Sequence, residues 1–314
     1  MKKMNSKPSR TRASCCSLTL SAFALVILAG PAPAVASEKT FTTIDFPGAD
    51  SSMAVGINAR GDIVGVYGVV GMNHGFLLSR GEFTAIDFPD VTFTRADGIN
   101  RDGDIVGAYR LGGTTGCSVS VSPPCRGYRL SGGEFTMIDG PDAIGTLAVG
   151  INARGDIVGS FTADQVVAHG YLLSGGEFTT IDFPDATVNI ANGINRRGNI
   201  VGWYTAADDT THGYLLSGGA FTPIDFPGAT FTRADGINRR GDIVGWYRTV
   251  GTTQCPVTSL DCHGFLLSEG EFTSIDFPGA TLTTSSGINA RGDIVGRYVG
   301  ADGRQHGYLL SGED

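Results

Sequence analysis

The sequence predicts an all-β fold, a six-bladed β-propeller whose blades have four strands each. The first observation is a segment that occurs six times and reads approximately F-T-x-I-D-F-P, then G-I-N-x-x-G-D-I-V-G-x-Y, then H-G-Y-L-L-S-x-G. The second is the repeat length of 42 to 52 residues, since the G-I-N triplets begin at Gly56, Gly98, Gly150, Gly193, Gly236 and Gly287. A repeat of this length is one supersecondary unit that buries its apolar face only against a neighbouring copy.

Four short runs in each repeat predict the strands of a blade. In the first copy they span residues 54–58, 62–67, 75–79 and 83–88, and they are rich in β-branched and aromatic residues. The turn at 58–61 begins with Asn and ends with Gly, as type I turns favour, and Ser-Arg-Gly-Glu at 79–82 predicts a two-residue hairpin turn. No segment has a sustained helical period. We expect the blades to start near residues 52, 94, 146, 189, 232 and 283.

The outer copies predict how the ring of blades closes. Residues 41–46 match the fourth strand of a blade, and residues 306–311 match a third strand. We expect the N-terminal strand to pair with the C-terminal blade, because this pairing removes two sheet edges. An open solenoid is the alternative, and it would need polar caps instead. The segment T-F-T-R-A-D occurs at both 92–97 and 230–235, which indicates that three blades were duplicated.

Residues 1–36 have the pattern of a secretory signal peptide, so we expect the protein to be extracellular or periplasmic. A basic start precedes an apolar run at 18–28, and Ala-Val-Ala at 34–36 is a small-residue cleavage site. The apolar run is short for a membrane span, and we expect none after signal removal. Residues 37–314 then form one β-propeller domain, expected to be a monomer.

The charge of the chain narrows the class of partner. The net charge is −8, and it becomes −13 for residues 37–314, because the first 36 residues hold five basic and no acidic residues. An acidic surface argues against nucleic acid and against anionic lipid as partners.

Four cysteines of residues 37–314 come in two pairs, Cys117 with Cys125 and Cys255 with Cys262. Each pair lies in the loop that makes its repeat longer than the others. We predict two local disulfides formed in an oxidising compartment, with free thiols as the alternative. Two cysteines per loop supply half of a zinc ligand set, so we expect no metal there.

All five histidines occupy one repeat position, where the second copy has arginine. If Ser79 faces Glu82 across the hairpin turn, the same register makes His74 face Asp87. The register predicts six cross-strand pairs: His74–Asp87, Arg126–Asp139, His169–Asp182, His212–Asp225, His263–Asp276 and, through ring closure, His306–Asp45. We interpret these pairs as structural, because no nucleophile is repeated beside them. A catalytic dyad in one blade or a metal site is the alternative.

Arg-Gly-Asp occurs at 60–62, 154–156, 240–242 and 291–293. Integrin recognition is one interpretation of these triplets, but we favour a hairpin corner at which glycine is needed for the turn. The Asn-x-x-Gly-Asp stretch also lacks the acidic ligands and the distal Glu of a calcium loop.

The G-I-N-x-x-G-x-I-V-G and H-G-F/Y-L motifs resemble the HAF-type extracellular repeat family of bacterial secreted proteins, over about residues 41–312. The usual His-Ala-Phe of that family appears here as His-Gly-Phe or His-Gly-Tyr. The resemblance implies secretion and repeated β structure. It carries over no activity, cofactor or catalytic residue.

The candidate binding residues are expected on the face of the ring that carries the variable second turns. The residue before the aromatic in I-V-G-x-Y varies, and it is Trp203, Trp246 and Arg297 in the last three copies. Arg95 and Arg233 are expected to reach the same face from the linkers between blades. The two tryptophans would suit a sugar ring or a protein hot spot; packing between blades is the alternative.

Together these observations favour a secreted, non-enzymatic binding or scaffold module for an extracellular protein or glycan, without a cofactor. One alternative is a propeller enzyme, such as a glycan- or lactone-active hydrolase or lyase with a site in the central channel. The other alternative is a purely structural envelope protein.

Overall fold

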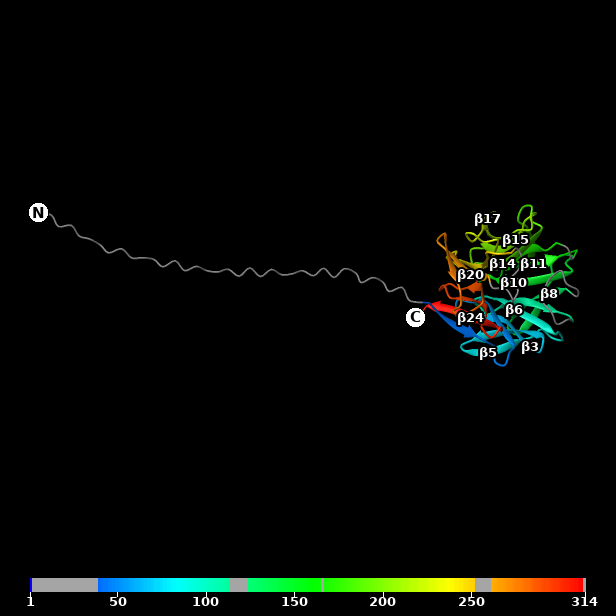
Figure 1. Ribbon diagram of the computed structural model, residues 1–314. Helices are drawn as coiled ribbons and strands as arrows, with labels where there is room; N and C mark the ends of the chain where they lie inside the picture. Colours follow the sequence, from blue (N-terminus) through cyan, green and yellow to red (C-terminus); the bar gives the residue numbers. More distant parts are fainter. Residues whose placement is uncertain (2–38, 113–123, 165–166, 252–260, 313–314) are drawn as a thin grey trace. The chain divides into compact units, whose positions relative to one another are not determined.

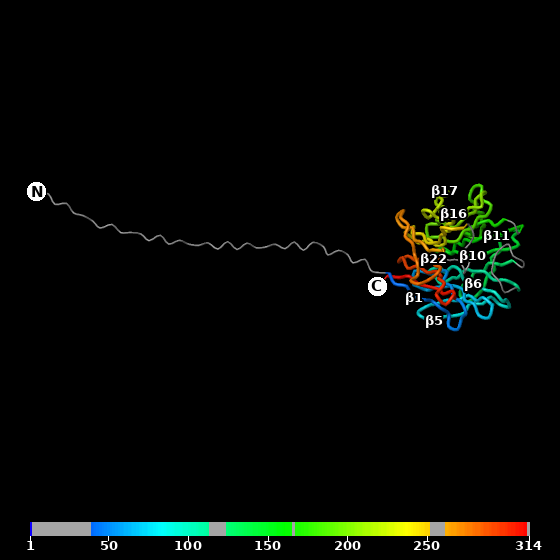
Figure 2. Tube along the Cα trace, viewed as in Figure 1, coloured from blue at the N-terminus to red at the C-terminus, as the bar shows by residue number. Residues whose placement is uncertain are grey.

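The computed structural model describes Met1 and residues 39–112, 124–164, 167–251 and 261–312. The chain divides into two units, Met1–Ser37 and Glu38–Asp314, and every described strand lies in the second unit (Figures 1 and 2). The described residues form 24 strands, and they include no helix that is long and apolar enough to cross a membrane.

Antiparallel pairing groups the strands into six four-strand units, which we call blades 1 to 6. Single parallel bridges, Asn73–Phe93 and Thr211–Phe231, also join blade 1 to blade 2 and blade 4 to blade 5. Blade 1 comprises β2 (Ser51–Ile57), β3 (Ile63–Val69), β4 (Met72–Ser79) and β5 (Glu82–Ile86), and blade 2 comprises β6 (Phe93–Ile99), β7 (Ile105–Arg110), β8 (Cys125–Ser131) and β9 (Glu134–Ile138). Blade 3 comprises β10 (Gly145–Ile151), β11 (Ile157–Thr162), β12 (His169–Ser174) and β13 (Glu177–Ile181), and blade 4 comprises β14 (Val188–Ile194), β15 (Ile200–Thr205), β16 (Thr211–Ser217) and β17 (Ala220–Ile224). Blade 5 comprises β18 (Phe231–Ile237), β19 (Ile243–Arg248), β20 (Cys262–Ser268) and β21 (Glu271–Ile275), and blade 6 comprises β22 (Leu282–Ile288), β23 (Ile294–Val299), β24 (Gln305–Gly312) and β1 (Lys39–Ile44).

The predicted all-β fold of repeated four-strand units is confirmed, with small differences at the strand ends. Each of the first strands begins one residue before the blade start expected from the repeat. The fourth strand of blade 1 ends at Ile86 rather than at residue 88. The N–H of Phe88 instead donates a hydrogen bond to Thr94 Oγ1 of the next blade, at 3.0 Å. Pro89, which has no N–H, follows and could not donate to a strand ladder.

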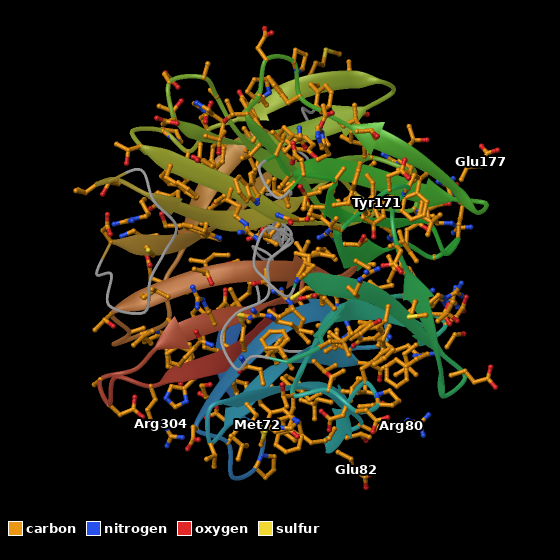
Figure 3. The ribbon with its side chains drawn as sticks, turned by 90° about the vertical axis from the view of Figure 1, so that its right-hand side faces the viewer. Met72, Arg80, Glu82, Tyr171, Glu177 and Arg304 are labelled. Carbon is orange, nitrogen blue, oxygen red and sulfur yellow. The ribbon has the colours of Figure 1, made fainter. Side chains whose placement is uncertain are left out.

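The turns have the geometry that their residues favour. Gly61 donates its N–H to the carbonyl of Asn58 at 3.1 Å, and its φ of 90° suits glycine. At the third turn, Ser79 lies opposite Glu82, and both central residues have positive φ, as a type I′ hairpin requires. In Figure 3, Arg80 and Glu82 extend from this turn at the edge of the molecule, whereas Tyr171 lies inside blade 3.

Neighbouring blades are joined by aromatic stacking. Phe46, from the F-P linker, stacks on Tyr67 of blade 1 with 3.7 Å between ring centroids and 3° between planes. The equivalent stacks are Phe88–Tyr109, Phe183–Tyr204, Phe226–Tyr247 and Phe277–Tyr298. In blade 3 the linker has Gly140 instead of phenylalanine. The tyrosine that recurs in I-V-G-x-Y therefore packs against the linker. Each aromatic pair stabilises the fold by about 0.5–1.5 kcal/mol beyond the contribution of its buried apolar surface.

The first strands of neighbouring blades lie against each other, and they include β22 of blade 6 against β2 of blade 1. In Figures 1 and 2, β6 and β10 lie toward the middle of the second unit, whereas β5 and β17 lie at its edge. Strand β1 pairs with β24 from Lys39 opposite Gly312 to Ile44 opposite Gly307. The N-terminal strand thus takes the outer place in the C-terminal blade.

Candidate functional site

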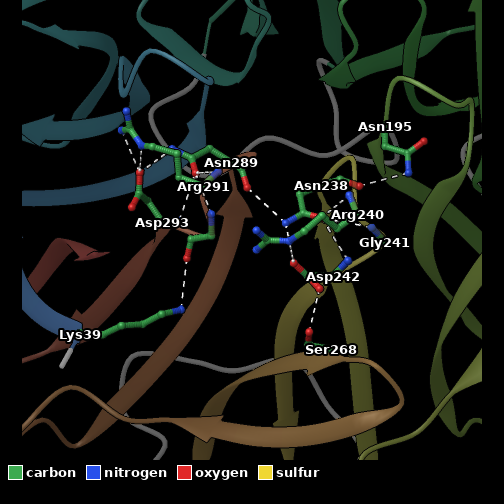
Figure 4. Close-up of polar contacts among 11 residues, drawn as sticks. Lys39, Asn195, Asn238, Arg240, Gly241, Asp242, Ser268, Asn289, Arg291 and Asp293 are labelled. Atoms are coloured by element: carbon green, nitrogen blue, oxygen red, sulfur yellow. Dashed lines mark hydrogen bonds and ion pairs between the residues drawn. The ribbon is translucent and has the colours of Figure 1, made fainter. Parts of the chain in front are cut away.

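The G-I-N-x-x-G-D turns form a network of buried amides and carboxylates (Figure 4). In blade 5, Asn238 donates through Nδ2 to Asp242 Oδ2 at 2.8 Å and to the carbonyl of Asn289 in blade 6 at 3.2 Å. The same bond from one asparagine side chain to the asparagine carbonyl of the next blade occurs for Asn58, Asn152, Asn195 and Asn289. The asparagine of the motif is thus a hub residue that connects blades.

The aspartate of each Arg-Gly-Asp triplet belongs to this network. Asp62 accepts hydrogen bonds from Asn58, Arg60 and, at 2.7 Å, from Ser79 Oγ of the third strand. Burial raises the pKa of Asp62, but these hydrogen bonds outweigh burial, and the net pKa is lowered. The carboxylate is committed to bonds inside its own blade, which favours the hairpin-corner interpretation over integrin recognition.

The six cross-strand positions have their side chains in contact. His74 Nδ1 lies 2.7 Å from Asp87 Oδ1, and Arg126 Nη1 lies 2.8 Å from Asp139 Oδ1 in the blade that departs from histidine. The other contacts, at 2.7–3.0 Å, are His169–Asp182, His212–Asp225, His263–Asp276 and His306–Asp45. Each contact joins the third strand of a blade to the residue that follows its fourth strand. This geometry fits a structural bond that is repeated in every blade.

A cavity of about 320 Å³ lies among the first strands of all six blades. One level of its wall is a collar of isoleucines, each 7–8% exposed: Ile57, Ile99, Ile151, Ile194, Ile237 and Ile288. The residue before each G-I-N glycine also lines the cavity, and it differs between blades: Val55, Asp97, Val149, Asn192, Asp235 and Ser286. The repeated frame thus surrounds a cavity whose lining is not repeated.

Two ion pairs lie in this cavity, in blades 2 and 5. Arg95 Nε is 2.8 Å from Asp97 Oδ1, and Arg233 Nε is 2.6 Å from Asp235 Oδ1. Asn192 of blade 4 also donates to Asp235, at 2.7 Å. Burial raises the pKa of both carboxyl groups, and the arginines offset this only in part.

The two tryptophans flank one of these arginines. The guanidinium of Arg233 lies 5.4 Å from the ring centroid of Trp203 and 6.0 Å from that of Trp246. Trp246 is 6% exposed and stacks on Phe231 at 4.6 Å. It also belongs to a buried cluster with Leu282 and Val299 of blade 6. Both indoles therefore lie beside Arg233, and Trp246 combines that contact with the packing between blades that was the alternative interpretation.

Arg297 brings a third guanidinium to the cavity from blade 6. It lies opposite Thr284 across the first two strands, and it donates to Gln305 Oε1 at 2.6 Å. Burial and the positive charge of Arg233 lower the pKa of Arg297, and the carboxylate of Asp235 offsets this only in part, so the net pKa is about 10. Arg297 thus remains charged at neutral pH in a region of positive potential.

The structure brings together four of the five predicted binding residues, since Arg95, Arg233, Trp246 and Arg297 line the one cavity. Trp203 lies beside Arg233. Both Arg95 and Arg233, expected in linkers, lie inside strands β6 and β18.

Sequence reasoning missed Asp97, Asn192 and Asp235. The available signal was that the residue before the G-I-N glycine varies, although the glycine after it is constant and the residue before it is alanine in five of the six copies.

The predicted disulfides fall partly outside the described residues. Cys125 and Cys262 are buried at the starts of β8 and β20, whereas Cys117 and Cys255 lie outside the part that the structure describes. The pairing stays a prediction. Among the described residues, no group of three or more His, Cys, Asp or Glu side chains is arranged to hold a metal ion.

No family model matches the chain, and no curated protein matches it either. The resemblance to the HAF-type repeats therefore stays a prediction. Solved structures do match, and they show that the fold is similar to six-bladed β-propellers.

A mutant of the Aleuria aurantia lectin in complex with Fucα1-6GlcNAc matches with a TM-score of 0.52 and 11% identity, over 82% of this chain and 91% of that one. The fucose-specific lectin from Aleuria aurantia matches with a TM-score of 0.51 and 12% identity, over 84% and 97%. SapL1 lectin in complex with α-methyl fucoside matches with a TM-score of 0.50 and 9% identity, over 84% and 96%. At these identities the likeness concerns the fold alone.

Proposed function

We propose that this chain is a non-enzymatic glycan-binding module of the β-propeller class, with its binding site in the cavity between the six blades. The observation that carries the proposal is the non-repeated lining of that cavity. The Ile collar is the same in every blade, whereas three arginines, two aspartates, an asparagine and a tryptophan occur only in particular blades. Departures from a repeat at one shared position are where a common frame acquires a binding function.

The chemistry of the lining suits a saccharide. Guanidinium, carboxylate and amide groups are directional partners for hydroxyl groups, and Trp246 contributes an apolar ring. Several solved structures with this fold are lectins in complex with fucosides, which shows that the architecture accommodates sugar binding in those proteins. For this chain that function is the proposal.

Binding is favoured over chemistry by the state of the two carboxylates. Asp97 is held by Arg95, and Asp235 is held by Arg233 and Asn192. A general acid or base must transfer a proton to or from a substrate, and these fixed donors already occupy the carboxylate oxygens that would do so, although burial raises the pKa of both groups.

The proposal includes a closed ring of blades and export of the protein. Closure is supported by the pairing of β1 with β24 and by the bond from Asn289 of blade 6 to the carbonyl of Asn58 in blade 1. Arg304 of blade 6 also donates to the carbonyls of Ala49 and Asp50, at 2.6 and 3.0 Å. Export, to the cell surface, the periplasm or the medium, rests on the signal-like residues 1–36. N-terminal sequencing of the exported protein should begin at Ser37, and a start at Met1 would contradict it.

The test of binding is a broad glycan array probed with protein expressed from the full sequence. Trp246→Ala removes a cavity wall, so it should abolish the signal. Arg240→Gln is the matched control, since Arg240 lies in the same blade at the turn and pairs with Asp242 outside the cavity. Loss of signal in both variants, or no signal from folded wild-type protein, would refute the proposal.

A further inference from the structure

The two halves of the ring carry equivalent ion pairs in different surroundings. Arg95–Asp97 in blade 2 corresponds to Arg233–Asp235 in blade 5 by the shared T-F-T-R-A-D segment. Across the strand pair, Arg95 lies opposite Ala108, whereas Arg233 lies opposite Trp246. The second half therefore has a bulky aromatic group where the first half has a methyl group.

The blades that flank blade 5 also have larger or more polar residues at these positions than the blades that flank blade 2. The position that holds Ala108 in blade 2 is occupied by Val66 in blade 1 and Ser160 in blade 3, whereas blades 4 and 6 have Trp203 and Arg297 there. The residue before the G-I-N glycine changes from valine in blades 1 and 3 to Asn192 and Ser286 in blades 4 and 6. The surroundings of the ion pair in blade 5 therefore include indoles, an amide and a second guanidinium, which the surroundings of the ion pair in blade 2 lack.

These added groups fix the guanidinium of Arg233. The two indoles flank it, and Asp235 holds its Nε. Asp235 is itself held by Asn192, so the ion pair is positioned from blades 4 and 5 together. A guanidinium held in this way loses little conformational entropy when it binds a ligand.

The charge of the cavity is positive although the protein is acidic. The ionisable groups that line it are Arg95, Arg233 and Arg297 against Asp97 and Asp235, a surplus of one positive charge. Residues 37–314 as a whole carry −13. Burial is the main cause of the lowered pKa of Arg297, and repulsion from Arg233 lowers it by more than attraction to Asp235 raises it. An anion placed between Arg233 and Arg297 would relieve this repulsion.

We propose that the cavity binds the carboxylate of an acidic saccharide, with Arg233 and Arg297 holding the carboxylate; this inference rests on the proposed glycan-binding function. Arginine is suited to carboxylates because its donors match them in geometry. A sugar ring is favoured over a small free anion by the volume of about 320 Å³, within the range of ligand pockets. Asn192, Thr284 and Ser286 offer further polar groups to hydroxyls.

The test is isothermal titration calorimetry of the full chain at low ionic strength. The probes are methyl glycosides of glucuronic, galacturonic and mannuronic acid, each beside its neutral hexose counterpart, with sodium acetate as the free anion. At least one uronide should bind about tenfold or more tightly than its neutral counterpart, and acetate should bind far more weakly than the uronide. The comparison of charged and neutral sugars uses wild-type protein, so it does not depend on the folding of any variant.

Variants then locate the carboxylate. Arg297→Gln should weaken uronide binding about tenfold or more and leave the neutral sugar within about twofold, whereas Arg297→Lys should retain part of the preference. Arg240→Gln should change neither affinity, because it lies outside the cavity.

Each other outcome is informative. Equal affinity for a uronide and its neutral counterpart would overturn this inference and leave the proposed function standing. Acetate that binds as tightly as the uronide would assign the site to a free anion and overturn the inference. No binding of any sugar would overturn the inference and the proposed function together.

Discussion

Replacement of Asn238 by alanine should be one of the most destabilising single changes in the hub network. Asn238 is 3% exposed, and its Nδ2 donates to Asp242 and to the carbonyl of Asn289 (Figure 4). Its Oδ1 accepts from the backbone N–H groups of Arg240, Gly241 and Asp242 at 2.9–3.1 Å. The change leaves the buried N–H of Asp242 without a partner, at about 1–3 kcal/mol, and removes one of the two donors to the carbonyl of Asn289, which keeps the N–H of Gly292. Together we expect a loss of about 3 kcal/mol.

Differential scanning calorimetry can measure this loss. For a domain of this size, 1 kcal/mol corresponds to about 2 °C in Tm, so Asn238→Ala should lower Tm by about 6 °C. Arg240→Gln is the control at the same turn, and it should cost about 0–1 kcal/mol because the arginine side chain is 54% exposed. If the two variants lowered Tm equally, the argument that the buried amide joins the blades would be wrong.

Three further predictions concern other parts of the fold. Gly98→Ala would place a Cβ 2.6 Å from the backbone oxygen of Val149 in the next blade, so urea denaturation should show a loss of about 1–3 kcal/mol; an unchanged midpoint would contradict it. Burial lowers the pKa of His306, but the carboxylates of Asp45 and Asp302 outweigh it, and the net pKa is raised. A folded-state pKa above the unfolded one gives stability that is present below about pH 6.5 and is lost as the pH rises through the folded value. The Tm advantage of wild type over His306→Gln should therefore shrink between about pH 6 and pH 8, and an advantage that grows with pH would rule this out. Finally, denatured exported protein should contain no thiol that reacts with Ellman's reagent if both predicted disulfides form, and four reactive thiols would exclude them.

The four-strand units and the register of their hairpins can be predicted from the sequence, because short-range features such as turn residues determine them. A turn that places Ser79 opposite Glu82 sets the register of the whole hairpin, so the expectation that His74 faces Asp87 needs only the strand period. The four-strand units follow from the same combination of turn residues and β-rich runs.

The lining of the cavity was not readable in this way. A register shift lies between Ala54 and Gly56 in β2, and the same shift occurs in the first strand of every blade. Beyond such a bulge the simple alternation of faces no longer holds, so the residues that face the centre could not be assigned by counting. The contact of Arg233 with both indole rings could not be predicted from the sequence either. Trp203 and Trp246 come from different blades, and the distance between them depends on the angle between the two sheets.

The hydrogen bonds from the asparagine of one blade to the asparagine carbonyl of the next all run in one direction, and this limits how the number of blades can change during evolution. In blades 1, 3, 4, 5 and 6 the asparagine of the motif donates to the carbonyl of the following blade, so these contacts between neighbours are head-to-tail. Head-to-tail contacts return to their origin only when the rotation per step divides a full circle. In the closed ring that we propose, the number of copies would therefore be set by the angle at each junction and not by the length of the gene. A seventh copy would require a smaller angle between neighbouring blades at every junction at once. Gain or loss of a single repeat is therefore less accessible than a substitution among the residues that line the cavity.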